Sequence, residues 1–358
     1  MNLTLHLTEN CNLNCKYCIR NKRPSDMSED ILIKACDLAF SNSQKMAGLC
    51  FFGGEPLLRK DLIYKALDYC LERSKATGVI FKSKMTTNGT LLDEEFLKRA
   101  REVDMGIGLS FDGLAQDDCR CFPDGSGSRK ILEEKAKLLL SYLPMSYAML
   151  TLAPECVDKY FESVRYLHDL GFVRILTTPA YGRNVNWTDE DLAKLKTQYE
   201  KTMEWFEEII LSGQYLYISP FTPKIIECIT GRNSAEHCHL GIKQMPVNVD
   251  GKLYPCTSFI GDEDYCLGDV FTGIDVKKQV ELAKKSSTPK TCIDCDLVKR
   301  CTNSCGCANR MNTGDENTVS ALQCSIERMT IEVSDKAGEN IFTADPEIFK
   351  KTFAKGIK

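Results

Sequence analysis

The segment Leu3-Thr-Leu-His-Leu-Thr-Glu-Asn-Cys-Asn-Leu-Asn-Cys-Lys-Tyr-Cys18 opens the chain with a strand pattern followed directly by closely spaced cysteines. Leucines alternate with polar residues over residues 3–7, which predicts a β-strand. Cys11, Cys15 and Cys18 then fall within eight residues on the loop that leaves this strand. A structural zinc site needs four ligands, whereas an iron–sulfur cluster held by three thiolates keeps one iron free for another ligand. The segment therefore predicts a reactive iron–sulfur site at the end of the first strand.

The predicted strand and its loop are the first part of a pattern in which strands alternate with helices. Apolar runs predict six strands, at residues 3–7, 48–52, 81–86, 105–110, 146–152 and 173–178. Segments of helical period lie between them, at residues 28–42, 61–77, 93–103, 128–142 and 156–170, and a long helix is predicted at 190–211. Six such units predict an α/β fold, a partial (β/α)6 barrel of the TIM type, with functional residues at the C-terminal ends of the strands.

Length and charge exclude several classes of protein. The 358 residues suffice for two to three domains, and 46 Lys and Arg against 50 Asp and Glu give a net charge of −4 without a basic stripe. We therefore expect no nucleic-acid partner. Apolar runs such as residues 49–52 are far shorter than the roughly 20 residues that a bilayer span needs. With no signal-peptide pattern at the N-terminus, a cytoplasmic protein is predicted.

Cysteine is the residue whose use departs most from the average, with 19 in the chain. In a reducing compartment, clustered cysteines indicate metal binding rather than disulfides. A second cluster lies near the C-terminus, in a region rich in Gly, Pro and turn residues. That region is predicted to be a small domain organised by metal.

The first cluster and the strand ends resemble the radical S-adenosylmethionine (radical SAM) superfamily. Its hallmark is CxxxCxxC with an aromatic residue before the last cysteine, here Tyr17. The run Gly53-Gly54-Glu55-Pro56 after the second strand resembles the GGEP motif, which in the family holds the amino group of S-adenosylmethionine. Two glycines allow close backbone approach, and Glu55 or neighbouring carbonyls can accept from an ammonium group. The resemblance implies a [4Fe–4S] cluster on Cys11, Cys15 and Cys18.

Two further strand ends match segments that line the cofactor in this family. Asn88, Ser110 and Asp112 offer hydrogen-bonding groups for the ribose, although each is also a common turn or cap residue. Arg120 lies in a match to the family's D-x-x-R segment, so it is a candidate to clamp a carboxylate; an exposed helix arginine is the alternative. Cys119 and Cys121 flank Arg120 and are candidate catalytic residues on position alone.

The C-terminal cysteines resemble the seven-cysteine signature of the SPASM domain, which holds two auxiliary [4Fe–4S] clusters. Carried over by position, the first auxiliary cluster would take Cys238, Cys256 and Cys305. The second would take Cys292, Cys295, Cys301 and Cys324. A pair of structural zinc sites is the alternative, since repeated CxxC is also zinc spacing. Seven ligands leave one position open, for which Cys228, ten residues before Cys238, is the best candidate by position. Cys307, Cys266, water and substrate are the other candidates, and Cys307 stands where the pattern usually has Gly.

These assignments divide the chain into four predicted parts. Residues 1–186 form the radical SAM barrel, 187–232 a helical linker, 233–330 the SPASM domain and 331–358 a helical tail. The resemblance implies S-adenosylmethionine and three [4Fe–4S] clusters as cofactors, with flavodoxin or ferredoxin as reductant.

The resemblance implies a maturase that abstracts a hydrogen atom from a peptide. In anaerobic sulfatase maturases an Asp follows the cysteine that matches Cys256, but Thr257 follows here. The surrounding sequence is more similar to maturases that install thioethers or other crosslinks in ribosomally made, Cys-containing peptides. Ten residues precede Cys11, so leader recognition is expected from the barrel or from a separate protein. Formylglycine formation, small-molecule dehydrogenation and a non-catalytic electron carrier remain alternatives.

Overall fold

The computed structural model describes residues 2–20, 22–41, 45–182, 184–231, 240–242, 244–285, 288–302 and 305–354. It divides into two compact units. The first comprises Met1–Ser110, Arg120–Ser146 and His239–Ser286, and the second comprises Phe111–Cys119, Tyr147–Cys238 and Ser287–Lys358. We describe each unit by itself.

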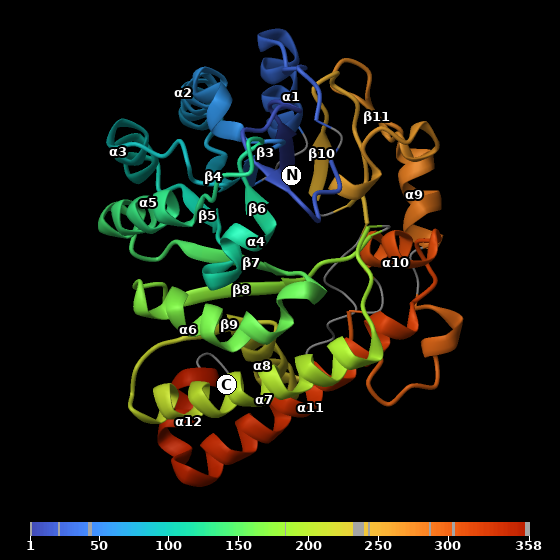
Figure 1. Cartoon of the computed structure of the whole chain (residues 1–358). Helices are drawn as coiled ribbons and strands as arrows, with labels where there is room; N and C mark the ends of the chain where they lie inside the picture. Colours follow the sequence, from blue (N-terminus) through green and yellow to red (C-terminus); the bar gives the residue numbers. More distant parts are fainter. Residues whose placement is uncertain are drawn as a thin grey trace. The chain divides into compact units, whose positions relative to one another are not determined.

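The first unit contains five parallel strands in the order β10, β1, β3, β4, β5 (Figure 1). Their bounds are β10 Gln244–Val247, β1 Asn2–His6, β3 Met46–Phe52, β4 Ile80–Thr87 and β5 Gly106–Ser110. The helices between them are α1 Glu29–Ser41, α2 Lys60–Thr77, α3 Glu94–Glu102 and α5 Arg129–Tyr142, and α9 Val276–Lys285 follows later. Because these strands are parallel, their C-terminal ends meet at one edge, which is where the candidate site residues lie.

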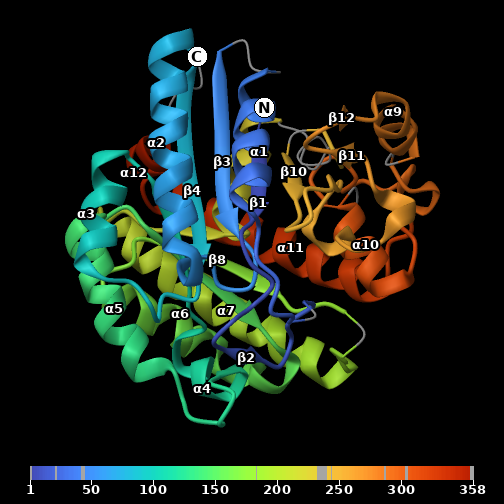
Figure 2. The same ribbon diagram turned by 90° about the horizontal axis from the view of Figure 1, so that it is seen from above.

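The core of the first unit explains why the strands read as apolar runs. Leu3 and Leu5 of β1 and Leu49 and Phe51 of β3 are essentially inaccessible to solvent, as expected for parallel strands covered on both faces. Figure 2 shows α1 and α2 running alongside β3 and β4. Gly78, with φ of +71°, ends α2 by donating its N–H to the Ser74 carbonyl.

The second unit has a smaller parallel set, β7 Tyr147–Leu152, β8 Arg174–Pro179 and β9 Tyr217–Ser219. Its helices are α4 Gln116–Cys119, α6 Tyr160–Asp169, α7 Asp189–Leu211, α8 Phe221–Thr230, α10 Gly306–Thr313, α11 Ala321–Ala344 and α12 Pro346–Phe353. A capping box formed by Thr188 and Asp191 starts α7. Helix α11 contacts both α7 and α8, so the segment that carries the last cysteine is packed into this unit.

The predicted parallel α/β architecture is confirmed. Each of the six predicted strands and six predicted helices is present, most with ends displaced by a few residues; the predicted helix at 156–170 is a 3-10 turn, Pro154–Lys159, followed by α6. Strands β9 and β10 were not predicted. They have three and four residues, and Pro246 interrupts β10, which occupies an edge position where proline is tolerated.

Among the described residues, none of the helices combines the length and the apolar character that a bilayer crossing requires.

Candidate functional site

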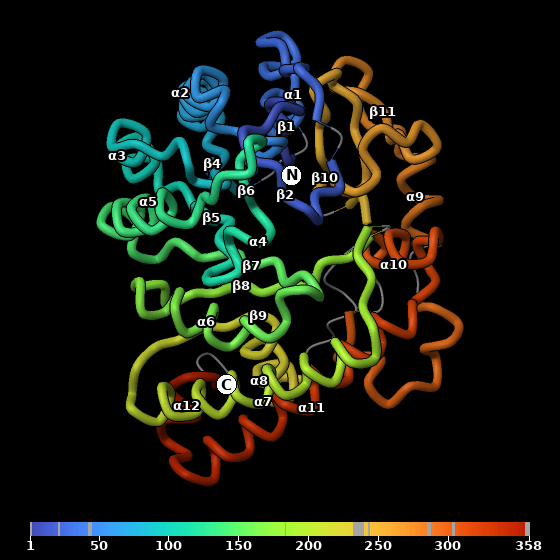
Figure 3. Tube along the Cα trace, viewed as in Figure 1, coloured from blue at the N-terminus to red at the C-terminus, as the bar shows by residue number. Residues whose placement is uncertain are grey.

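The first cysteine motif lies on the loop that follows β1. Within it, Asn14–Cys15 form the short strand β2, which pairs with β6, Arg120–Cys121 (Figure 3). Cys15 stands opposite Arg120 in this pairing. All three motif cysteines are free thiols, and Cys18 is exposed. The pairing therefore brings Arg120 and Cys121 beside the motif.

Arg120 stacks its guanidinium over Tyr17, the aromatic residue of the motif, with 5.2 Å between the guanidinium carbon and the ring centroid. The Arg120 side chain is buried rather than exposed on a helix, and the short strand that holds it is anchored because the Ser128 hydroxyl donates to the Arg120 carbonyl at 2.6 Å. A cation–π contact of this kind orients the ring and the cation together. The sequence did not predict this pairing.

The two glycines of the GGEP motif lie where the loop after β3 packs closely against the loop after β1, which leaves no room for a side chain. The Gly54 N–H donates to the Thr8 carbonyl at 2.8 Å, and the next N–H, of Glu55, donates to the Asn10 carbonyl at 2.9 Å. A Cβ on Gly54 would lie 2.0 Å from the Asn10 oxygen, and Gly53 has a φ of +134°. The close approach expected at these glycines is thus made to the backbone just before Cys11.

Glu55 is inaccessible to solvent, and its carboxylate accepts three hydrogen bonds within the protein. The donors are the Leu57 N–H at 3.0 Å, the Thr87 hydroxyl at 2.6 Å and the Asn88 N–H at 2.7 Å. Burial raises the pKa of Glu55 to about 7, and the three hydrogen bonds oppose this rise. In this arrangement the Glu55 side chain ties the end of β3 to the end of β4.

Asn88 lies directly against the cysteine loop. Its Nδ2 is 3.7 Å from the Cys11 Sγ and donates to the Asn12 Oδ1 at 2.8 Å. Burial raises the pKa of the Cys11 thiol, so an amide donor helps to stabilise a thiolate there. Pro56 follows Glu55 at the start of a short 3-10 turn and is buried.

Three other predicted site residues have different surroundings. Ser110 ends β5 and is half-buried. Asp112 is buried, and its Oδ1 accepts the Thr151 N–H at 2.8 Å, so the carboxylate holds the end of β7. Cys119 is buried as well, with its sulfur 3.4 Å from the sulfur of Cys156. The structure thus places Asp112 and Cys119 in structural contacts within the second unit.

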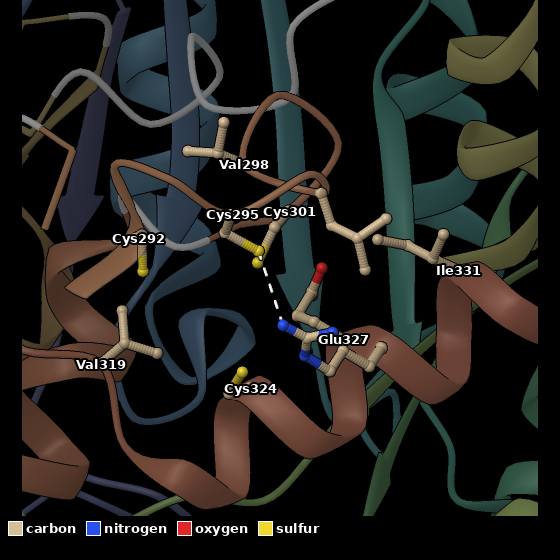
Figure 4. Close-up of a pocket in the computed structure, with 10 residues that line it drawn as sticks. Cys292, Cys295, Val298, Cys301, Val319, Cys324, Glu327 and Ile331 are labelled. Carbon is tan, nitrogen blue, oxygen red and sulfur yellow. Dashed lines mark hydrogen bonds between the residues drawn. The ribbon is translucent and has the colours of Figure 1, made fainter.

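Four C-terminal cysteines line one pocket of the second unit. They are Cys292, Cys295, Cys301 and Cys324, the set expected from the family resemblance for a second auxiliary cluster. Figure 4 shows their sulfurs spread around the pocket together with apolar side chains that include Val298, Val319 and Ile331. Soft thiolates in apolar surroundings are a donor set that suits an iron–sulfur cluster. Within the described ranges, no three His, Cys, Asp or Glu side chains converge closely enough to hold a metal ion, so the four cysteines line a pocket and do not form a preformed site for a single ion.

Arg328 also lines this pocket and was not predicted. Its guanidinium lies 3.6 Å from the Cys295 Sγ, and interactions with the thiols, led by a hydrogen bond to Cys324, raise the pKa of Arg328. The signal was present in the sequence, since Arg328 follows Cys324 by four residues and so shares its helix face.

The backbone beside Cys301 is held by hydrogen bonds and ion pairs to two helices. Arg300 donates two hydrogen bonds to Asp335 of α11, and Thr302 donates to Glu327 of α11 through both its N–H, at 3.2 Å, and its hydroxyl, at 2.6 Å. The buried Lys224 of α8 lies 3.4 Å from the same Glu327 and donates to the Arg300 carbonyl. These contacts fix the backbone on either side of Cys301.

A cavity of about 510 Å³ lies beside this segment in the second unit. Its wall includes Cys305 and Cys307, the hydroxyl-bearing residues Tyr181 and Thr178, and Glu327, which also lines the four-cysteine pocket. Burial raises the pKa of Tyr181, so this side chain is a neutral hydrogen-bonding group near pH 7. The volume falls in the range of ligand-binding cavities.

The cysteines predicted for the first auxiliary cluster, and the candidates for its open position, differ from one another in state. Cys238 lies outside the described residues. Cys256 and Cys307 are each disulfide-bonded in this structure. Cys228 is an exposed free thiol on α8. Of the two predicted cysteine sets, the second is the one that the described residues bring to one pocket.

Comparison with known proteins agrees with this geometry. The model of the radical SAM superfamily matches residues 5–195. The chain is 29% identical over 293 residues to the uncharacterized protein MJ0907 of Methanocaldococcus jannaschii, covering 80% of this chain and 92% of that protein. It is 25% identical over 331 residues to a cysteine-type anaerobic sulfatase-maturating enzyme of Clostridium perfringens, covering 82% and 85%.

Solved structures are similar in fold. The structure described as native anSMEcpe with bound AdoMet and Cp18Cys peptide matches with a TM-score of 0.83 at 19% identity, over 97% of this chain and all of that one. The Streptococcus suis protein SuiB bound to precursor peptide SuiA matches with a TM-score of 0.64 at 16% identity, over 90% and 75%. With a family model matching more than half of its length, from the strand before Cys11 onward, the chain belongs to the radical SAM superfamily and is an S-adenosylmethionine-dependent enzyme.

Proposed function

We propose that this enzyme is a maturase that oxidatively modifies a peptide, forming a thioether or another crosslink in a ribosomally made substrate. The observation that carries the proposal is the pairing of two features in the second unit. A cavity of ligand size and a four-cysteine pocket share the wall residue Glu327. A substrate in the cavity would then lie near an electron acceptor, which an oxidation without oxygen needs.

In the first unit, Cys11, Cys15 and Cys18 would hold a [4Fe–4S] cluster and the GGEP backbone would bind S-adenosylmethionine. When bound, these groups supply a 5′-deoxyadenosyl radical that takes a hydrogen atom from the substrate. The protein's own contribution is positioning. Glu55 joins two strand ends, Asn88 donates toward Cys11, and the backbone bonds of Gly54 and Glu55 fix the cofactor loop to the cysteine loop.

In the second unit, Cys292, Cys295, Cys301 and Cys324 would hold one auxiliary cluster. A third cluster, on Cys238, Cys256 and Cys305, is proposed from the family resemblance alone. We retain the predicted division into a barrel at 1–186, a linker at 187–232, a SPASM domain at 233–330 and a tail at 331–358 as part of this proposal. A flavodoxin or ferredoxin is the proposed reductant, and a separate leader-binding protein is a proposed partner.

Formylglycine formation is the second candidate, favoured by the identity to cysteine-type and serine-type sulfatase-maturating enzymes. That chemistry needs a base to take the proton from a Ser or Cys side chain as it is oxidised. The family resemblance places this base after Cys256, where Thr257 stands at the start of a short 3-10 turn. A threonine hydroxyl is too weak a base for this role near neutral pH. Crosslink formation is therefore the first choice.

The experiment incubates the anaerobically reconstituted enzyme with S-adenosylmethionine, dithionite and two peptides, and reads product masses. One peptide carries a sulfatase motif, and the other is a Cys-containing precursor encoded near the gene. Loss of two hydrogens with resistance to thiol alkylation supports the crosslink. Conversion of the sulfatase peptide to its aldehyde supports the second candidate and contradicts the first. The Cys11→Ala/Cys15→Ala/Cys18→Ala variant is the control, since it must yield no 5′-deoxyadenosine.

Iron content tests the cluster assignment separately. About twelve irons per chain are expected for three clusters, and the triple alanine variant should lose about one third of them. A content near four, or zinc bound at Cys292 to Cys324, would contradict the auxiliary clusters.

A further inference from the structure

The cavity of the second unit contains a buried acceptor that the described residues leave unused. Gln323 of α11 lines this cavity and is 2% exposed, and its Oε1 has no hydrogen-bond partner among the described residues. Nearly all buried polar atoms in folded proteins are hydrogen-bonded, so an exception calls for a reason. We propose that the Gln323 Oε1 accepts the N–H of a peptide group and so binds the backbone of the substrate. The inference rests on the proposed function, because that function places a peptide in the cavity.

The sequence around Gln323 would ordinarily supply a partner within the helix. Ser320, which precedes α11, and Gln323 have the spacing of a capping box, in which the Gln side chain accepts the backbone N–H of the Ser. Helix α7 completes such a pair, between Thr188 and Asp191. In α11 only one half is made: the Gln323 N–H donates to the Ser320 hydroxyl at 3.1 Å, while the Gln323 Oε1 is not paired with another described residue. The side-chain oxygen is therefore available to the cavity that Gln323 lines.

The charge of the cavity wall favours an uncharged donor. Among the described residues that line the cavity there is no Lys, Arg or His, so a carboxylate ligand would meet no cation there. The acid of the wall, Glu327, is already compensated: the Lys224 Nζ lies at 3.4 Å, and Thr302 donates to Glu327 through its N–H and its hydroxyl. A compensated carboxylate offers little to a cationic ligand. A peptide N–H is an uncharged donor and matches an amide oxygen.

The rest of the wall suits the carbon atoms of a peptide. Pro179, Pro220 and Ile326 contribute apolar surface, and the volume of about 510 Å³ is in the range of ligand-binding cavities. A cluster sulfur beside Cys305 would not satisfy the Gln323 oxygen, because sulfurs of iron–sulfur clusters accept hydrogen bonds and do not donate them. The unpaired acceptor therefore favours a ligand that carries an N–H.

The test compares two small probes on the anaerobically reconstituted enzyme. N-acetylalanine N-methylamide carries two peptide N–H groups, and its di-N-methylated analogue keeps both carbonyls but has no N–H. The affinity of each probe is measured by ligand-observed NMR for the wild type, Gln323→Met, Gln323→Leu and Gln214→Met. Gln214 is exposed in the loop that follows α7 of the same unit, so it is the matched control. Met and Leu keep the backbone N–H that Ser320 caps, and circular dichroism and iron content check each protein.

The wild type and Gln214→Met should bind the N–H probe about fivefold more tightly than the methylated analogue, the effect of one buried hydrogen bond. The Gln323 variants should lose this preference. Equal binding of the two probes by the wild type, binding of neither, or a preference that survives in the Gln323 variants would overturn the proposal. The wild-type comparison needs no variant, so the proposal can fail even if both substitutions prevent folding.

The product-mass assay reports on the proposed function separately. A crosslinked peptide from an enzyme that shows no preference between the probes refutes this site and leaves the maturase function standing. A clear preference that depends on Gln323, without any modified peptide, supports the binding site and refutes the maturase function.

Discussion

Replacing Glu55 by Gln should destabilise the protein in a way that depends on pH. The carboxylate is fully buried and accepts from Leu57, Thr87 and Asn88. A Gln side chain keeps the shape but turns one acceptor into an NH2 group that faces a backbone N–H. The loss of one buried hydrogen bond, with a donor left unsatisfied, should lower the free energy of unfolding by about 1–3 kcal/mol.

The pH dependence follows from the pKa of Glu55, which burial raises from 4.5 to about 7. The folded protein then binds this proton more tightly than the unfolded chain. The contribution of Glu55 to the free energy of unfolding is therefore fully present below pH 4.5 and is lost as the pH rises through 7. Between pH 6 and 8 the wild-type protein should lose roughly 1 kcal/mol from this group, whereas Glu55→Gln has no such titration. The penalty of the substitution should therefore be smaller at pH 8 than at pH 6.

Anaerobic urea unfolding at the two pH values measures these differences. Thr87→Val, which removes one of the three donors, should cost about 1 kcal/mol, and the exposed Glu95→Gln serves as the matched control with little effect. Cleavage of S-adenosylmethionine is measured in parallel, because Asn88 also contacts Cys11. The reasoning is refuted if Glu55→Gln unfolds as the wild type does, or if its penalty is the same at both pH values.

Three further changes test other contacts. Gly54→Ala should abolish cleavage of S-adenosylmethionine in the 5′-deoxyadenosine assay, because its Cβ would lie 2.0 Å from the Asn10 carbonyl oxygen; full activity would show that the two loops separate freely. Arg328→Gln should make the reduction potential of the auxiliary cluster proposed at Cys292, Cys295, Cys301 and Cys324 more negative in a redox titration, because a cation beside the thiolates is lost; an unchanged potential would contradict this. Asp335→Asn, which breaks the paired bonds to Arg300, should lower the free energy of unfolding by about 1 kcal/mol in urea, and equal stability would remove the role given to this pair.

The strands and the second cysteine set could be predicted from the sequence, because residue periodicity and cysteine spacing indicate them. Parallel strands buried on both faces read as apolar runs, so β1, β3 and β4 were predicted nearly to their ends. The four cysteines of the second set were grouped from the family resemblance, and the structure brings them to one pocket.

Partners that are distant in the sequence could not be predicted. Glu55 or the neighbouring carbonyls were expected to accept from an ammonium group, but nothing in the sequence indicated that Thr87 and Asn88, more than thirty residues away, donate to the Glu55 oxygens. Cys119 was a candidate catalytic residue because it neighbours Arg120. The two side chains have different partners, however: Cys119 lies against Cys156, and Arg120 stacks over Tyr17. Proximity along the chain did not indicate which way either side chain points.

If the four-cysteine pocket holds the proposed auxiliary cluster, helix α11 would link iron supply to the lifetime of the protein. It contributes Cys324 to the four-cysteine pocket, and through Glu327 and Asp335 it holds the loop that carries Cys301. Metal binding to such a site adds its free energy to folding, so a chain without iron should open here first and expose the helix to proteases. A cell short of iron would then clear this enzyme instead of accumulating an inactive form, and abundance would follow metal status without any dedicated sensor.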